Sequence, residues 1–97
     1  MVVIVTEKAP PRLRGELTRW LLETKPGVFV GKVSAMVREK LWNKVCEEEP
    51  AVSSVIIYTA ANEQGFSMKM HGEPQRQVVE LEGLQLIKYM DTEELVE

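Results

Sequence analysis

A chain of 97 residues has room for one small domain, which excludes a catalytic domain joined to a separate regulatory one. Its 44% hydrophobic and 28% charged residues are typical of a globular rather than a disordered protein. A single cysteine (Cys46) and a single histidine (His71) exclude a disulfide framework and a Cys/His zinc cluster within one chain, and they favour a reducing cytoplasm. The longest apolar run, Met1–Val5, is too short to span a membrane and has no features of a signal peptide.

The first third of the chain predicts a strand, a helix and a second strand. VVIVT at 2–6 is apolar and β-branched, as in a buried central strand. Pro10-Pro11 ends that strand and presets the first helical turn. The segment 12–24 then predicts a helix whose core face is formed by four apolar residues at helical spacing: Leu13, Leu17, Trp20 and Leu21. Pro26-Gly27 ends this helix, and residues 28–33 predict a short strand.

The remainder predicts one more helix and four strands. Ser34 is a suitable N-cap for a helix that runs to about Cys46, and Pro50 prevents its continuation. Strands are expected at 52–59, 66–71, 77–82 and 84–90, with a bend at Gly83 between the last two. We expect a single domain over residues 1–90, followed by an acidic C-terminal tail at 91–97.

This order of elements predicts an α+β fold, a ferredoxin-like sandwich with two helices on one face of an antiparallel sheet. Each predicted helix has one apolar stripe, so the helices cover one sheet face only. The other face would carry apolar side chains that water alone does not suit, and these are Ile56, Tyr58, Phe66, Met68 and Met70. We therefore predict a homodimer that packs through its sheets.

The net charge of −3 hides an uneven distribution along the chain. Residues 1–44 carry nine basic and four acidic side chains, whereas residues 45–97 carry three basic and eleven acidic ones. Basic side chains gather at the start of the first predicted helix, with Arg12 and Arg14 preceded by Lys8. A helix start and arginine forks both suit phosphate groups, so this segment is a candidate contact to the backbone of a nucleic-acid duplex. The alternative is a solvated helix face with ion pairs such as Arg12–Glu16 and Arg19–Glu23.

Two further segments have a functional and a structural interpretation. Glu7 follows the first strand, where a hard divalent cation such as Mg²⁺ would bind if a dimer axis joined two copies. The alternative is a solvated acid, because one carboxylate per chain is a poor metal site. The strand LQLIKYM at 84–90 is apolar on both sides, so it either lies inside its own sheet or is added to a partner.

Several motifs together resemble a known family. They are VTE at 5–7, PPRLRGEL at 10–17, WLLE at 20–23, GVFVG at 27–31, VSAMVRE at 33–39, GF at 65–66 and the V-x-L-x-G-L segment at 79–84. This combination resembles the type I-E branch of the CRISPR-associated adaptation proteins, the small, non-integrase subunit of the spacer integrase. The wider family is described as CRISPR-associated endoribonucleases.

The resemblance implies a ferredoxin-like homodimer that sits between two dimers of the larger integrase subunit and holds duplex prespacer DNA. Carried over by position, Arg12, Arg14 and Arg76 would contact phosphates, and Glu7 would occupy the family's metal position. The C-terminal strand would dock on a neighbour, and its residues expected to bind a partner are Leu84, Leu86, Ile87 and Tyr89.

The chain departs from the family pattern where an Arg-Arg pair is usual, since it has Gln75-Arg76. Lys8 and Lys25 are further candidates for phosphate contact, Lys25 as partial compensation for the missing arginine. The strand acid is Glu7 rather than the aspartate of the wider family, which argues against nuclease activity. We therefore expect a cytoplasmic DNA-binding protein of CRISPR spacer acquisition. The alternative is a magnesium-dependent endonuclease that acts on RNA or duplex DNA.

Overall fold

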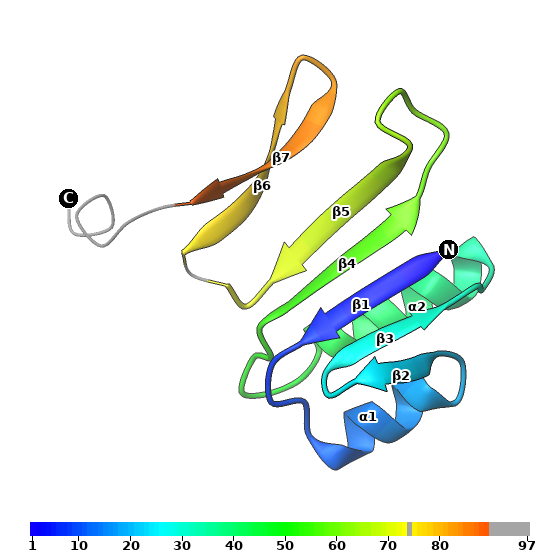
Figure 1. Cartoon of the computed structure of the whole chain (residues 1–97). Helices are drawn as coiled ribbons and strands as arrows, with labels where there is room; N and C mark the ends of the chain where they lie inside the picture. The colour runs from blue at the N-terminus through cyan, green and yellow to red at the C-terminus, as the bar shows by residue number, and fades with distance from the viewer. Residues whose placement is uncertain (74, 90–97) are drawn as a thin grey trace.

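A computed structural model describes residues 1–73 and 75–89, so the predicted tail at 91–97 lies outside the described residues. The fold is α+β, with a five-stranded antiparallel sheet in the order β2-β3-β1-β4-β5 and a separate two-stranded sheet formed by β6 and β7. Both helices pack against one face of the larger sheet. In Figure 1, α2 lies behind β1 and β3, and α1 lies below β2. The elements are β1 (Val2–Thr6), α1 (Pro11–Thr18), β2 (Leu22–Lys25), β3 (Val28–Gly31), α2 (Ala35–Cys46), β4 (Ser54–Thr59), β5 (Phe66–His71), β6 (Arg76–Leu81) and β7 (Leu84–Tyr89). Neither helix among the described residues is long and apolar enough to cross a membrane.

The prediction for the first strand and the second helix is confirmed. β1 is the central strand and pairs antiparallel with β3 and β4. Its side chains alternate between buried and half-buried, so one face of β1 meets the helices and the other does not. α2 begins after Ser34, whose side-chain oxygen accepts a hydrogen bond from the backbone N–H of Val37.

The prediction for the first helix is wrong beyond Thr18. α1 has eight residues, Trp20 is 54% exposed rather than on the core face, and Leu22–Lys25 forms strand β2. The helix ends where the Thr18 hydroxyl donates to the carbonyl oxygens of Arg14 and Gly15. The helix therefore ends before Trp20, although Trp20 keeps the helical spacing of the apolar residues.

A tight turn between β2 and β3 explains why the chain leaves the helix early. Pro26 and Gly27 form a two-residue loop, and Lys25 pairs with Val28 across it. Gly27 has a φ of 83°, and a β-carbon there would collide with the carbonyl oxygen of Thr6. Proline followed by glycine is the pattern of a type II turn, which joins two strands rather than ending a helix.

The core lies between the larger sheet and the helices. Leu13 and Leu17 of α1 pack there with residues from α2 and with the buried side of the sheet, which includes Phe29 and Ile56. One part of the dimer prediction needs correction, because Ile56 is fully buried and Tyr58 packs against this core. Both therefore lie on the helix side of the sheet rather than on its other face.

The opposite sheet face is nevertheless apolar. Strand register places on it nine half-buried side chains, Val3, Val5, Val28, Val30, Val55, Ile57, Phe66, Met68 and Met70. We call this set the open sheet face, because neither helix covers it (Figure 1). Three of its members are among the side chains that the sequence placed there.

β6 and β7 form a hairpin with Glu82 and Gly83 at its turn, both at positive φ. Two glutamine side chains connect the hairpin to the larger sheet. The backbone N–H of Gln85 donates to Oε1 of Gln64 at 2.9 Å, and Nε2 of Gln64 donates to the carbonyl oxygen of Gln85 at 2.8 Å. The backbone N–H of Met68 on β5 donates to Oε1 of Gln85 at 2.6 Å. Hydrogen bonds of the two side-chain amides thus hold the hairpin beside β5.

Candidate nucleic-acid interface

The fold gathers the predicted phosphate-contacting residues around the carboxyl end of β1. Lys8 follows β1 and shares one surface cavity with Arg12 and another with Arg14. Lys25 directly precedes the Pro26-Gly27 turn. This turn lies at the end of β1, because the Gly27 carbonyl oxygen accepts a hydrogen bond from the backbone N–H of Thr6. Arg76 begins β6 and shares a cavity with Glu7. Segments far apart in the sequence therefore meet at one end of the sheet.

Arg12 is paired with a carboxylate that the sequence did not assign to it. Its Nη2 lies 3.1 Å and 3.3 Å from the two carboxylate oxygens of Glu48, in the segment after α2. The Arg12 side chain is 81% exposed, whereas that of Glu48 is only 10% exposed. Both residues line a surface cavity of about 630 Å³ together with Lys8. A phosphate that approached Arg12 in this cavity would meet the Glu48 carboxylate as well.

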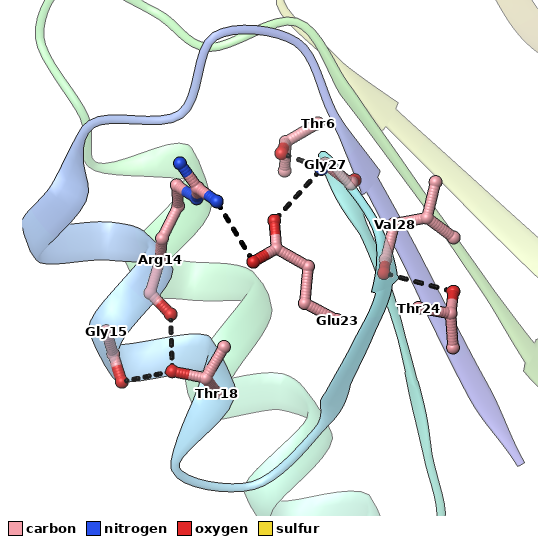
Figure 2. Close-up of polar contacts among 8 residues, drawn as sticks. All are labelled: Thr6, Arg14, Gly15, Thr18, Glu23, Thr24, Gly27 and Val28. Carbon is pink, nitrogen blue, oxygen red and sulfur yellow. Dashed lines mark hydrogen bonds and ion pairs between the residues drawn. The ribbon is translucent and has the colours of Figure 1, made fainter.

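Arg14 is held in a different way, as Figure 2 shows. Its Nη2 donates to Oε1 of Glu23 on β2 at 3.1 Å, and the other oxygen of Glu23 accepts from the backbone N–H of Gly27 at 3.1 Å. These two hydrogen bonds, first that from Gly27 and then that from Arg14, lower the pKa of Glu23 below its ordinary value. The carboxylate therefore stays ionised and ties α1 to the turn between β2 and β3.

These contacts correct the ion pairs expected from helical spacing. Arg12 pairs with Glu48 rather than Glu16, and Glu16 instead lies 3.7 Å from the ammonium group of Lys44. Glu23 pairs with Arg14 rather than Arg19, because the helix ends before it. Sequence spacing missed both carboxylate partners. The Pro-Gly turn was the available signal for Glu23, since it indicates a strand there.

Glu7 and Arg76 lie at a third point of the same end of the sheet. Together with Glu73 they line a small cavity of about 140 Å³. Glu73 accepts a hydrogen bond from the Ser53 hydroxyl at 3.3 Å, and the backbone N–H of Glu7 donates to the Ser53 carbonyl oxygen. The guanidinium of Arg76 also lies 5.5 Å from the ring centre of Tyr89 on β7.

The residues around Glu7 do not fit a divalent cation within one chain. Among residues 1–73 and 75–89, no group of three or more histidine, cysteine, aspartate or glutamate side chains lies close enough to hold a metal. Mg²⁺ prefers six oxygen ligands, of which a protein commonly supplies one or two carboxylates. Glu7 and Glu73 would therefore need further ligands from a substrate or from a second copy of the chain.

The predicted partner-binding residues lie on the hairpin and not inside the larger sheet. Leu84, Leu86, Ile87 and Tyr89 belong to β7, and all four are exposed. Within the part of the chain that the structure describes, β7 pairs only with β6. The alternative of an internal strand in the larger sheet is therefore wrong for this segment.

Comparison with known protein families matches residues 1–86 to the CRISPR-associated protein family Cas_Cas2CT1978. The match covers both helices and the larger sheet, and it extends into β7. The chain therefore belongs to this CRISPR-associated family, and this membership indicates a role in CRISPR adaptation.

Proposed function

We propose that this protein is the structural DNA-binding subunit of a CRISPR spacer-acquisition complex of the type I-E branch. In this proposal, a cytoplasmic homodimer bridges dimers of the larger integrase subunit and holds duplex prespacer DNA by its phosphates. The observation that carries the proposal is the meeting of Lys8, Arg12 and Arg14 around the end of β1, beside the turn that Lys25 precedes, in a member of a CRISPR-associated family. Arg76 adds a further cation beside them.

The arrangement of elements supports a ferredoxin-like domain. Its first six elements run β-α-β-β-α-β, and their four strands lie in the order β2-β3-β1-β4. This is the pattern of a split β-α-β fold, to which β5 adds one edge strand. The fold places the ends of β1 and β2 and the starts of α1, β3 and β4 close together, where the basic residues lie.

Two apolar surfaces support the assembly. The open sheet face extends from Val3 on β1 to Met70 on β5, and its apolar side chains suit packing against a second copy of the chain. The exposed apolar residues of β7 suit the addition of a strand or hairpin to the integrase subunit. Ile57→Lys should then yield a monomer in sedimentation, whereas removal of the chain from Leu84 onward should abolish co-elution with an integrase subunit.

Duplex binding is tested by removing the two arginines of α1 together. Arg12→Ala plus Arg14→Ala should weaken binding of unrelated duplexes to a similar degree, because phosphates carry no sequence information. The slope of log affinity against log salt concentration should fall by about 2 in magnitude if two phosphate contacts are lost. Arg19→Ala plus Lys88→Ala removes the same charge from other parts of the surface and serves as the matched control. Equal losses in the two double variants would contradict the proposed interface.

The second candidate is a magnesium-dependent endonuclease. Glu7 and Glu73, which line one cavity, would supply two carboxylates, and a substrate or a second copy of the chain would supply the other ligands. Purified protein would be incubated with RNA and with duplex DNA, with and without Mg²⁺ or Mn²⁺. Metal-dependent cleavage that disappears in Glu7→Ala would support the nuclease. Cleavage that Glu7→Ala leaves unchanged would indicate a contaminating enzyme.

A further inference from the structure

The two arginines of α1 differ in where their carboxylate partners lie. Arg14 lines a cavity of about 170 Å³ together with Lys8 and the Pro26-Gly27 turn. Glu23 contacts two residues of that cavity, Arg14 and Gly27, but does not itself line it, and its side chain is 19% exposed. Glu48, by contrast, lines the cavity that Arg12 faces.

We propose that Glu23 is a positioning residue, which holds Arg14 at the wall of this cavity so that one duplex phosphate binds between Arg14 and Lys8. The proposal rests on the proposed DNA-binding function. The contact that Glu23 makes with Arg14 uses Nη2, and no other side-chain contact of this guanidinium occurs among the described residues. Nε, Nη1 and the second N–H of Nη2 remain as donors. That N–H and the nitrogen beside it form the planar, two-point fork that a phosphate prefers.

Backbone hydrogen bonds fix the position of Glu23, and through it the position of the Arg14 side chain. Glu23 accepts from Gly27 N–H, and the Gly27 carbonyl oxygen accepts from the Thr6 N–H at 2.7 Å. The Arg14 carbonyl oxygen accepts from Thr18 at 2.9 Å (Figure 2). The end of β1, the β2–β3 turn and α1 are thus joined at Glu23. An arginine fixed in this way loses less side-chain entropy when it binds a phosphate.

Neutralisation of Glu23 has two opposite effects on the affinity for a duplex, one through its charge and one through the position of Arg14. Removal of a negative charge near the site would by itself strengthen binding to a polyanion. Release of Arg14 would weaken it, by no more than about threefold, because an exposed ion pair holds its side chains only weakly. A net loss of affinity therefore reports positioning, and a gain reports simple repulsion.

The experiment compares Glu23→Gln with Glu48→Gln in duplex titrations at fixed salt. Both variants remove one charge from an arginine partner, and glutamine retains an oxygen that can accept the hydrogen bond from Gly27. We expect Glu23→Gln to weaken duplex binding by up to about threefold, because removal of its charge offsets part of the loss, while Glu48→Gln does not weaken it. Added to Arg14→Ala, Glu23→Gln should cause no further loss, because its effect passes through Arg14.

Each result separates the two proposals. An equal loss from Glu23→Gln with and without Arg14 would indicate general destabilisation and overturn the positioning role. Unchanged or tighter binding of Glu23→Gln would overturn it as well, while leaving the DNA-binding function standing. Failure of the unmodified protein to bind any duplex at low salt would overturn both. Thermal unfolding of every variant shows whether a loss of affinity reflects a loss of fold.

Discussion

The pair formed by Arg12 and Glu48 allows the effect of one charge on DNA binding to be calculated. Glu48 lines the same cavity as Arg12, and its carboxylate contacts Nη2 at 3.1 Å. Glutamine has nearly the same shape and can still accept a hydrogen bond from Arg12. Glu48→Gln therefore removes a charge from the cavity while the local geometry is retained.

The magnitude follows from the distance between the two anions. A phosphate oxygen bound to the outer side of the guanidinium would lie about 2.8 Å from it, which puts the phosphate about 6 Å from the Glu48 carboxylate. Because the Arg12 side chain is 81% exposed, a dielectric constant near that of water applies, and the repulsion is about 0.7 kcal/mol. Glu48→Gln should thus tighten duplex binding about threefold at low salt, and about twofold at 0.1 M, where the Debye length is about 10 Å.

The assay is a duplex titration at several salt concentrations, with thermal unfolding as a check on the fold. Glu39→Gln is the matched control, because Glu39 on α2 forms ion pairs with its neighbour Arg38 and with Lys69 on β5, and none of these residues belongs to the proposed interface. Weaker binding of Glu48→Gln in low salt would refute the reasoning, since it would mean that Glu48 helps Arg12 bind. A gain that does not shrink with added salt would also refute it.

Three further predictions concern the structure that supports the site. Gly27→Ala should lower the free energy of unfolding by at least about 1–3 kcal/mol in denaturant titrations, because of the positive φ at Gly27 and the collision with Thr6; stability equal to that of the unmodified protein would contradict the turn geometry. Phe29→Ala should cost about 3–5 kcal/mol, whereas Trp20→Ala should cost much less since Trp20 is exposed; similar losses would place Trp20 in the core after all. The lowered pKa of Glu23 means that its charge stabilises the fold above its ordinary value of 4.5 and ceases to do so as the pH falls through the lower folded value. The difference in unfolding temperature between the unmodified protein and Glu23→Gln should accordingly be constant above about pH 5 and shrink below it, and a difference that persists unchanged to pH 3 would contradict this pairing.

Local sequence signals predicted most of the fold. The β-branched run of β1, the Ser34 cap of α2 and the turn at Gly83 each depend on neighbouring residues, and all three were placed correctly. β2 was missed because Trp20 and Leu21 continue the helical spacing of α1. Pairing with β3 through the Pro-Gly turn outweighs that spacing, and pairing between strands is not a local property.

The ion pairs of the site were beyond local reasoning for the same reason. Arg12 and Glu48 are 36 residues apart, so only the packing of α1 against the segment after α2 brings them together. Spacing of four residues on one helix predicted the pairs Arg12–Glu16 and Arg19–Glu23 instead. The family resemblance predicted phosphate contacts for Arg12, Arg14 and Arg76, but it contained no information about which carboxylates they contact.

The charge pattern along the chain has a different meaning once these contacts are known. The acidic second half supplies Glu48 and Glu73 to the end of the sheet where the basic residues lie, so the two halves do not form separate faces. The five cations proposed for DNA binding are opposed there by a similar number of carboxylates, Glu7, Glu23, Glu48, Glu49 and Glu73. Long-range attraction of a duplex by one chain is therefore weak, because opposite charges cancel beyond a Debye length. In the proposed complex, affinity would come from arginines that contact phosphates directly, so the position of each guanidinium would matter more than the net charge of the chain.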